Sequence, residues 1–348
     1  MARRVLWASL ALAPATILVD RVAHPGATVL FVLAAAALVP LAWLIGEATE
    51  HAAEHTGPGI GGFLNATFGN APELIIATLA VKDLLPNVVR GSLTGSVVSN
   101  ILLVLGVAMI AGGDADLDRR SLLSQLGLVF AAVLLLLVPA VPSWDGGDPE
   151  RHSLALVSVG PAVVLLSLYV VVTVRGLRRH RQRHRESGVE RAAAWSLPAA
   201  LAVLAVATVL TAFVSELLVH SLDAFAHAAN LSEFFISAVI VAIVGNAAEH
   251  GGAVVIARRG KMKLATEIAI SSSAQVGLFV TPAVVLLSFA IGHALPLSFR
   301  PVELVAMGGA AAFVAFVIHD GRSKRWEGFL LVAVYAGVVG AFLAAGDR

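Results

Sequence analysis

Long apolar runs alternate with short polar breaks from one end of the chain to the other. A helix needs about 20 apolar residues to cross the hydrocarbon core of a bilayer, and successive runs have that length. The pattern predicts about eleven membrane-spanning helices, near residues 5–20, 26–49, 60–83, 86–111, 121–143, 153–175, 195–219, 232–257, 263–292, 301–319 and 327–345. We therefore expect an all-α polytopic membrane protein that lies in a lipid bilayer and has almost no extramembrane domain.

Composition supports this fold class. Of the 348 residues, 58% are hydrophobic and only 14% are charged, whereas soluble domains carry about 25% charged residues. Cysteine is absent, which excludes disulfides and thiolate metal ligands. The chain has no GxxxxGK[ST] stretch for a nucleotide. We expect no cofactor and no nucleic-acid partner, and the sequence leaves the oligomeric state open.

Basic residues predict the orientation of the spans. If the spans alternate, the side that holds the N-terminus carries eighteen of the 24 Lys and Arg residues. The positive-inside rule then places the N-terminus and the basic segment 175–191 in the cytoplasm and the C-terminus outside. We interpret that segment as a solvated connector that fixes topology, with a lipid-headgroup patch or a regulatory element as the alternatives. The compact chain, rich in Ala, Val and Arg, favours a bacterial inner (plasma) membrane.

One short motif occurs twice inside apolar runs. Residues 69–73 read GNAPE and residues 245–249 read GNAAE, 176 positions apart. Five predicted helices separate equivalent positions, and an odd number reverses direction, so the two copies cross the membrane in opposite senses. We predict an N-terminal helix (1–25), a first five-helix repeat (26–175), a basic cytoplasmic loop (176–194) and an inverted second repeat (195–348).

Glu73 and Glu249 are the principal candidates for function. Each lies deep inside a predicted span, where an ionised carboxylate is costly and an acidic residue indicates a functional site. Gly69 and Gly245 would allow close backbone approach, and Pro72 would free a backbone carbonyl. A pair of such glutamates at equivalent places predicts an ion site where the two halves meet.

The polar neighbours of the glutamates offer oxygen ligands. Oxygen-only ligand sets suit Ca2+, which takes roughly six to eight oxygens in adaptable geometry. We therefore expect Glu73 and Glu249 to bind the metal ion. The remaining candidates for the cation and proton site are Asn70, Asn246, Ser96, Ser99, Asn100, Ser272, Ser273 and Gln275. Small polar residues also serve helix packing, so ordinary packing is the alternative role for each of them.

The two motif regions resemble the paired repeats of Ca2+/H+ antiporters, the CAX branch of the calcium:cation antiporter superfamily. The resemblance is carried by GNAPELIIATLAV, GSLTGSVVSNILLVLG and GNAAEHGGAVVIARRGKMKLATEIAISSSAQVGLFVTP. It implies eleven spans, Ca2+/H+ exchange, and Glu73 and Glu249 as the carriers of cation and protons. Glu50 and Glu216 match acidic positions of the family. Relatives often have an acidic segment between the halves, where this chain has a basic one.

Two buried carboxylates that repel each other need either one Ca2+ or about two protons to become neutral. Because the bare dianion is costly to move, exchange of one filling for the other follows without ATP. We therefore expect a secondary transporter and not an enzyme. Glu50, Glu216 and His250 are secondary candidates that could take up protons, and His250 is as well explained as a hydrogen-bond donor between helices.

Other functions stay open as alternatives. Sodium/calcium exchangers typically have Ser or Thr in place of the Asn-Ala found here, and Mn2+/H+ or Na+(K+)/H+ exchange would use similar oxygen ligands. HAAEH at residues 51–55 matches the H-x-x-E-H pattern of inverted zinc proteases, but a vestibule that attracts cations explains it better. A passive cation channel is the remaining alternative, and an inverted repeat argues against it.

Overall fold

The computed structural model describes residues 2–187 and 195–347, and within these ranges the chain is almost wholly helical. The α-helices are α1 (Ala2–Ser9), α2 (Leu12–Ala23), α3 (Ala27–Phe68), α4 (Ala71–Lys82), α5 (Pro86–Val98), α6 (Leu105–Gly112), α7 (Arg119–Ala140), α8 (His152–Ser187), α9 (Leu197–Ala229), α10 (Glu233–Ile236), α11 (Ala242–Gly245), α12 (Ala247–Arg258), α13 (Met262–Gln275), α14 (Thr281–Ile291), α15 (Pro301–Val317) and α16 (Arg325–Ala345).

Shorter elements join some of these helices. The π-helical segments are η1 (Ser99–Val104), η3 (Ser237–Val241) and η4 (Val276–Val280), and the 3-10 turns are η2 (Val141–Trp144) and η5 (Ile318–Asp320). Strands β1 (Ala115–Asp116) and β2 (Arg322–Ser323) pair antiparallel and tie the α6–α7 connection to the α15–α16 connection. Because η1 and η4 continue their helices without a break, α5 to α6 and α13 to α14 each form one long helical span.

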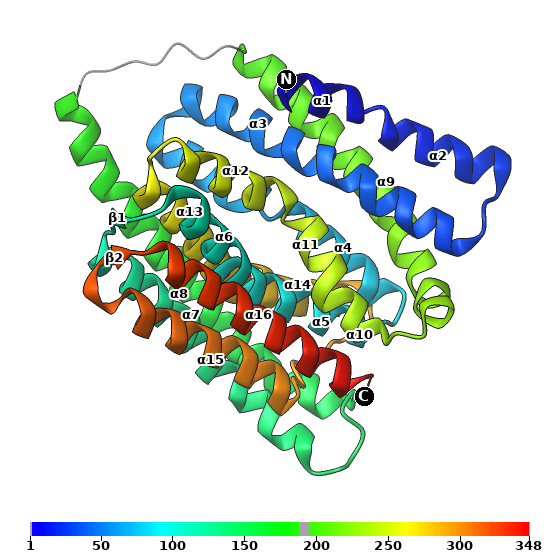
Figure 1. Cartoon of the computed structure of the whole chain (residues 1–348). Helices are drawn as coiled ribbons and strands as arrows, with labels where there is room; N and C mark the ends of the chain where they lie inside the picture. The colour runs from blue at the N-terminus through cyan, green and yellow to red at the C-terminus, as the bar shows by residue number, and fades with distance from the viewer. Residues whose placement is uncertain (1, 188–194, 348) are drawn as a thin grey trace.

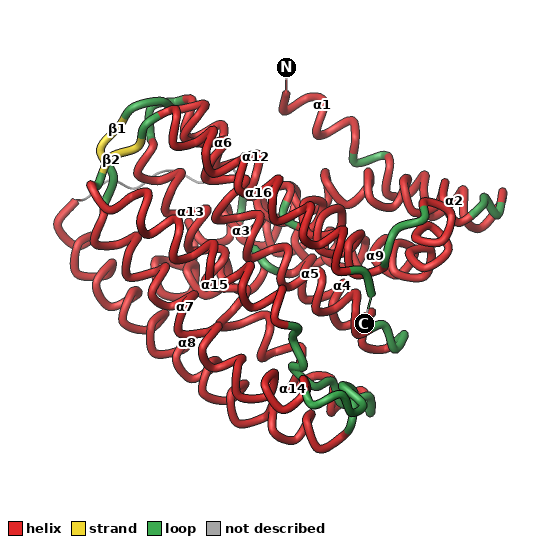
Figure 2. The backbone as a smooth tube through the Cα atoms, turned by 60° about the horizontal axis from the view of Figure 1, so that its bottom comes forward, coloured by secondary structure: helices red, strands yellow, loops and turns green. Residues whose placement is uncertain are grey.

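The helices form a bundle with two parts. Helices α1, α2, α3 and α9 lie together along one edge, whereas α7, α8, α15 and α16 form the opposite edge (Figures 1 and 2). The apolar contact between α3 and α9 has its own cluster, in which Leu44, Ile45 and Ala48 meet Leu204 and Ala207. Between the two edges lie α4, α5 and α10 to α14, which carry the polar residues singled out in the sequence.

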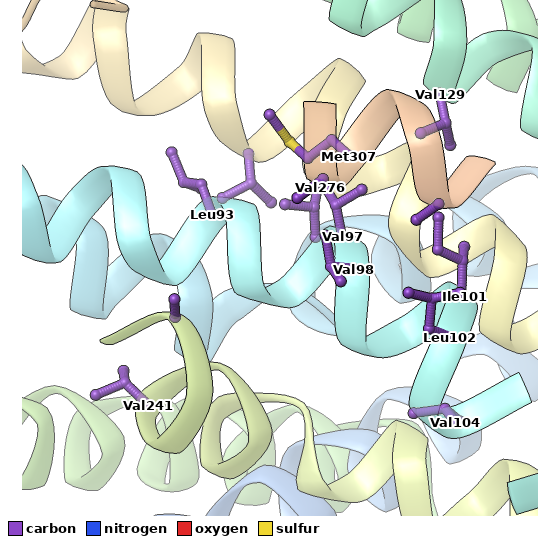
Figure 3. Close-up of a cluster of buried hydrophobic side chains, with 14 of the residues drawn as sticks. Leu93, Val97, Val98, Ile101, Leu102, Val104, Val129, Val241, Val276 and Met307 are labelled. Carbon is purple, nitrogen blue, oxygen red and sulfur yellow. The ribbon is translucent and has the colours of Figure 1, made fainter. Parts of the chain in front are cut away.

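The main hydrophobic core surrounds α5 and η1. Leu93, Val97 and Ile101 of this span belong to one buried apolar cluster with Val276 of η4 and Met307 of α15 (Figure 3). Large apolar side chains also cover the outside of the bundle, as the exposures of 71% for Val305 and 70% for Phe316 on α15 show. Apolar residues inside and out suit a helical bundle whose solvent is lipid, because helices satisfy their backbone hydrogen bonds internally.

Helix starts follow local chemistry. Asp118 accepts a hydrogen bond from the backbone N–H of Ser121 at the start of α7, and Ser232 accepts one from Phe235 at the start of α10. Pro86 and Pro301 occupy the first positions of α5 and α15, where a missing N–H costs nothing. These signals account for the close match between predicted and observed starts of several spans.

Nine helices of the described ranges are long and apolar enough to cross a membrane, and the bent pair Glu233–Gly245 and Ala247–Arg258 makes ten. The all-α membrane fold is confirmed, with a number of spans close to the predicted eleven. The predicted span at 60–83 is not among the ten, because its residues are divided between the end of α3 and the twelve-residue α4. The break between these helices falls at Gly69 and Asn70.

Two predicted loops are helical instead. The chain stays helical from Ala27 to Phe68, although we expected a polar break after residue 49. It also stays helical to Ser187, through most of the basic segment 175–191. The basic stretch is rich in Arg, which favours helix strongly enough to extend a span beyond its apolar part. Residues 57–62 of α3 read GPGIGG, which disfavour helix, so intrinsic propensity does not explain the continuous helix there. Residues 188–191 of the basic segment lie outside the described ranges.

Candidate cation and proton site

The two GNA motifs form equivalent breaks in the helices. Asn70 has φ −99° and ψ 15° between α3 and α4, and Asn246 has φ −92° and ψ 10° between α11 and α12. The second break bends the chain by 57°. Helices α4 and α12 each have 12 residues, with Glu73 and Glu249 in their first turns. A helix N-terminus has free backbone N–H groups and a positive dipole end, which favour a carboxylate there.

Glu73 is buried against the opposite break. Its side chain is 5% exposed, and a Cβ added to Gly245 would lie 3.8 Å from its Oε1 atom. Its Oε2 atom has no hydrogen-bond partner among the described residues. Glu249 is partly buried and lies within electrostatic range of Glu73. The structure therefore brings the two carboxylates to one place, as the repeated motif predicts.

The break at Asn246 carries a connected set of hydrogen bonds. Asn246 Nδ2 donates to the Ala242 carbonyl at 2.9 Å and to Ser96 Oγ at 2.8 Å. Asn100 Nδ2 donates to Asn246 Oδ1 at 3.3 Å and to Ser272 Oγ at 3.1 Å. Ser272 Oγ in turn donates to Glu249 Oε2. The amides and hydroxyls of both halves thus meet at Glu249.

The remaining polar candidates lie beside this set. Asn70 Nδ2 donates to Gln275 Oε1 at 2.7 Å, which joins α4 to α13. Ser273 Oγ donates to the Val97 carbonyl at 2.9 Å, and Ser99 Oγ to the Ser96 carbonyl at 3.4 Å. Ser273 therefore acts as a helix-to-helix contact in this arrangement. As cation ligands, all of these residues stay predictions.

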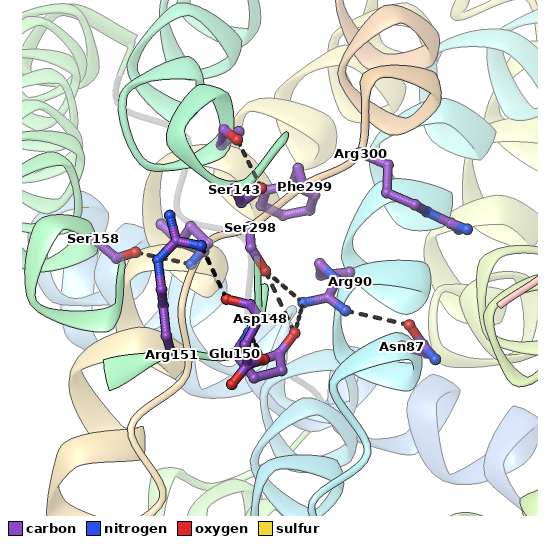
Figure 4. Close-up of polar contacts among 12 residues, drawn as sticks. Asn87, Arg90, Ser143, Asp148, Glu150, Arg151, Ser158, Ser298, Phe299 and Arg300 are labelled. Atoms are coloured by element: carbon purple, nitrogen blue, oxygen red, sulfur yellow. Dashed lines mark hydrogen bonds and ion pairs between the residues drawn. The ribbon is translucent and has the colours of Figure 1, made fainter. Parts of the chain in front are cut away.

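An ion pair between the buried Arg90 and the partly exposed Glu150 anchors the start of α5, the helix that carries Ser96. Arg90 is 2% exposed, and its Nη1 atom donates to Glu150 Oε1 at 2.6 Å and to Ser298 Oγ at 2.8 Å (Figure 4). A buried charge of this kind needs its partners, so Arg90 ties α5 to two surface connections. Beside it, the Arg151 guanidinium lowers the pKa of Asp145 through hydrogen bonds.

Comparison with known proteins gives the family. The protein family described as "sodium/calcium exchanger protein" matches this chain over residues 26–176 and 199–344. The Ca2+/H+ antiporter ChaA of Bacillus subtilis is 38% identical over 322 residues, 90% of this chain and 91% of ChaA. The chain belongs to the sodium/calcium exchanger family. A Ca2+/H+ antiporter of Synechocystis is 36% identical over 339 residues, which cover 91% of either chain.

Solved structures agree with this membership. Native YfkE matches with a TM-score of 0.83 at 34% identity, over 98% of this chain and 99% of YfkE. The H+/Ca2+ exchanger CAX matches in fold with a TM-score of 0.75 at 16% identity, over 99% of this chain and 91% of CAX. The resemblance drawn from the motif copies is confirmed. The exchanger is a multi-pass membrane transport protein.

The secondary acidic candidates lie apart from the carboxylate pair. Glu50 is an exposed residue of α3. Glu216 on α9 accepts a hydrogen bond from Lys82 Nζ at 3.3 Å, and both side chains are about half exposed. Neither acid is hydrogen-bonded to the set around Asn246 in the contacts described above. The role of Glu50 and Glu216 in proton uptake therefore stays a prediction.

HAAEH forms a local surface cluster in the exchanger. His51 lies 3.4 Å from Glu54 and 3.8 Å from Glu47, all on α3, and His55 Nε2 lies 2.6 Å from the Trp195 carbonyl. Within the described ranges, no group of three or more His, Asp or Glu side chains could hold a metal ion. His51 and His55 have these other partners, so the geometry does not support the protease alternative.

Gly91 and Gly95 help to position the site, although they were not among the residues that we predicted for it. A Cβ on Gly91 would lie 2.7 Å from the Phe234 carbonyl oxygen, and one on Gly95 would overlap the backbone of Ala238. Their absence of side chains lets α5 cross α10 and η3 at backbone contact. The signal was present as GSLTG, a GxxxG spacing that is common where membrane helices approach closely.

Proposed function

We propose that this protein is a secondary antiporter that exchanges Ca2+ for H+ by alternating access. The observation that carries the proposal is the meeting of Glu73 and Glu249, each in the first turn of a helix that begins at a GNA break. The named activities of ChaA and of the Synechocystis relative, both Ca2+/H+ antiporters, support the same substrates.

The carboxylate pair explains why the two ions compete. Two carboxylates in a buried place raise each other's cost of ionisation, so the empty dianion is the unfavourable form. One Ca2+ or about two protons removes that cost. A change of access is then favoured only for a filled site, and Ca2+ entering from one side drives protons to the other.

The amide oxygens can still bind Ca2+. Asn246 Oδ1 accepts one hydrogen bond from Asn100 and Gln275 Oε1 accepts one from Asn70, and an amide oxygen has two lone pairs. We propose that Ca2+ draws amide oxygens toward the carboxylates, since Ca2+ accepts roughly six to eight oxygen ligands in flexible geometry. In the proton-loaded form the same amides satisfy one another. The site thereby has a stable arrangement for each filling.

We propose further that residues 26–175 and 195–348 are inverted repeats, with residues 1–25 as an additional helix and 176–194 as the cytoplasmic connection. Breaks at Asn70 and Asn246 and equal lengths of α4 and α12 support this division. The basic residues support a cytoplasmic N-terminus and an external C-terminus. Bacterial relatives support a plasma-membrane location.

The proposal is tested with purified protein in proteoliposomes that hold a preformed pH gradient. Addition of Ca2+ should dissipate the gradient, and Glu73→Gln or Glu249→Gln should abolish this, because one carboxylate cannot neutralise Ca2+. Asp83→Asn is the matched control, since Asp83 is an exposed acid at the end of α4. It should retain exchange.

Parallel additions of Mn2+, Na+ and K+ separate the possible substrates. A response to Na+ or K+ without Ca2+ would move the substrate while keeping the site. Full Ca2+ exchange in both glutamine variants would show that the carboxylate pair is not the ion carrier. Gel filtration of each variant establishes that the protein is folded.

A further inference from the structure

The direction of every hydrogen bond around Asn246 is fixed by one backbone group. The Ala242 carbonyl can only accept, so the side-chain atom of Asn246 that faces it at 2.9 Å must be the NH2 group. The oxygen of Asn246 then faces Asn100, which must present its own NH2 group. This leaves the Asn100 oxygen facing His250 Nε2 at a distance of 3.0 Å.

His250 must therefore donate. An amide oxygen has no proton to give, so a hydrogen bond between Asn100 Oδ1 and His250 exists only when Nε2 carries a hydrogen. The same orientation makes Ser272 accept from Asn100, which leaves the hydroxyl hydrogen of Ser272 for Glu249. A continuous path of donors thus runs from His250 through Asn100 and Ser272 to the carboxylate of Glu249.

The equivalent place beside Glu73 lacks this path. The residues 176 positions before His250 and 176 positions after Asn100 are Leu74 and Val276. Both partners of the hydrogen bond are thus apolar in the equivalent place, and Glu73 has an oxygen without a hydrogen-bond partner among the described residues. The contact between His250 of the second repeat and Asn100 of the first therefore has no polar counterpart at the equivalent place.

The surroundings leave Asn100 as the polar contact for the ring. His250 lines a cavity of about 420 Å3 between α12 and the η1–α6 span, and the other lining residues are Leu103, Val104, Val107, Gly251, Val254 and Val255. These are all apolar or glycine. Among the described residues that line the cavity, none offers a side-chain group that would compete for Nε2.

We propose that His250 is a positioning residue that holds the Asn100 amide through its Nε2–H group. It thereby keeps the Ser272 hydroxyl directed at Glu249. In this role the ring keeps its Nε2 hydrogen and carries no proton across the membrane. The inference rests on the proposed Ca2+/H+ exchange and deepens it, because it assigns an orienting function to a residue whose position beside Glu249 also fits a proton relay.

Two amide substitutions separate the roles. A glutamine amide reaches about as far as Nε2 of histidine and can donate, but it does not titrate; an asparagine amide reaches only about as far as Nδ1. We expect His250→Gln to keep the exchange rate within about threefold of the unsubstituted protein, with the same pH profile. His250→Asn and His250→Leu should lower the exchange rate about tenfold, because the Asn100 amide then loses the donor that fixes its orientation.

A double substitution tests the path itself. If His250 acts only through Asn100, Asn100→Ala should lose at least as much as His250→Leu, because Asn100 also donates to Asn246 and Ser272. The double variant should then lose no more than Asn100→Ala alone. His227→Leu is the control, because that histidine lies on α9 with its side chain 84% exposed. Its exchange should be unchanged.

The outcomes are read in folded protein with Ca2+-driven dissipation of a pH gradient. Loss in His250→Gln equal to that in His250→Leu, or a shifted pH profile in His250→Gln, would overturn the positioning role in favour of proton transfer. Full activity of His250→Asn would overturn it as well. Failure of the proposed function is distinct, because the unsubstituted protein would then show no Ca2+-driven proton movement.

Discussion

Ser272 connects the amide part of the site to the carboxylate part. Its hydroxyl accepts from Asn100 and donates to Glu249. A hydrogen bond to a charged group contributes about 1.5 to 3 kcal/mol, more than one between neutral groups. The orientation of the Glu249 carboxylate therefore depends on the Asn100 amide through the hydroxyl of Ser272.

Ser272→Ala removes this hydroxyl and little else. We expect the Ca2+ concentration for half-maximal exchange to rise about tenfold, because Glu249 loses its fixed donor. Ser271→Ala is the matched control, since Ser271 Oγ donates to the Ile268 carbonyl within its own helix. Exchange at a series of Ca2+ concentrations measures both. Equal Ca2+ dependence in the two variants would contradict the role of Ser272.

The sequence predicted which residues form the site better than it predicted which hydrogen bonds they make with one another. The repeated motif identified Glu73 and Glu249, and both lie at the meeting of the two halves. That Asn246 Oδ1 accepts from Asn100, however, depends on the Ala242 carbonyl, which accepts from the side-chain amide of Asn246 as well as from its backbone N–H. Hydrogen-bond direction is a property of the folded contact, and sequence spacing carries no information about it.

The crossing of α5 over α10 and η3 places the ligand-bearing part of one half against the other. Gly91 and Gly95 make that crossing possible, because a Cβ at either position would meet backbone atoms that cannot move aside easily. Tight backbone contact is how membrane helices gain packing energy when lipid offers no hydrophobic drive. The position of Ser96, one residue after Gly95, depends on this crossing.

Gly95→Ala should separate these elements. We expect a lower unfolding temperature in detergent and reduced exchange, because overpacking costs roughly 1 to 3 kcal/mol. Gly309→Ala on α15 is the control, since nothing lies within 4 Å of an added Cβ there. That change should leave the protein as stable or more stable, because alanine favours helix by about 1 kcal/mol over glycine. Equal unfolding temperatures in both variants would contradict the close crossing.

Element boundaries could be predicted where local chemistry determines them. Pro86 and Pro301 begin helices as expected. The breaks at the two GNA motifs lie inside spans that were predicted to be continuous, at 60–83 and 232–257. The polar ends of spans could not be predicted from hydropathy. Helix α8 continues through basic residues to Ser187. The length of an apolar run predicts the part of a helix that crosses the membrane, whereas helix propensity decides how far the helix continues beyond it.

At the scale of the whole molecule, equivalent positions recur 176 residues apart over long stretches. Helices α4 and α12 have Asp83 and Arg259 as their C-cap residues, which are such a pair, and α5 and α13 begin at Pro86 and Met262, which are another. If the halves are inverted, each pair must lie on opposite faces of the membrane. The charge difference between Asp83 and Arg259 agrees with the positive-inside rule, which puts Arg259 in the cytoplasm.

The absence of cysteine allows a direct test of this arrangement. Asp83→Cys and Arg259→Cys each introduce a single thiol at an exposed position. In intact cells, a membrane-impermeant thiol reagent should label Cys at 83 and not at 259, whereas inside-out vesicles should give the opposite result. Labelling of both from the same side would contradict the inverted repeat, because residues related by an inverted symmetry cannot share a face. Labelling at 259 from intact cells, and at 83 only in inside-out vesicles, would agree with the inverted repeat but reverse the orientation of the protein. The basic residues around Arg259 would then face the outside of the cell.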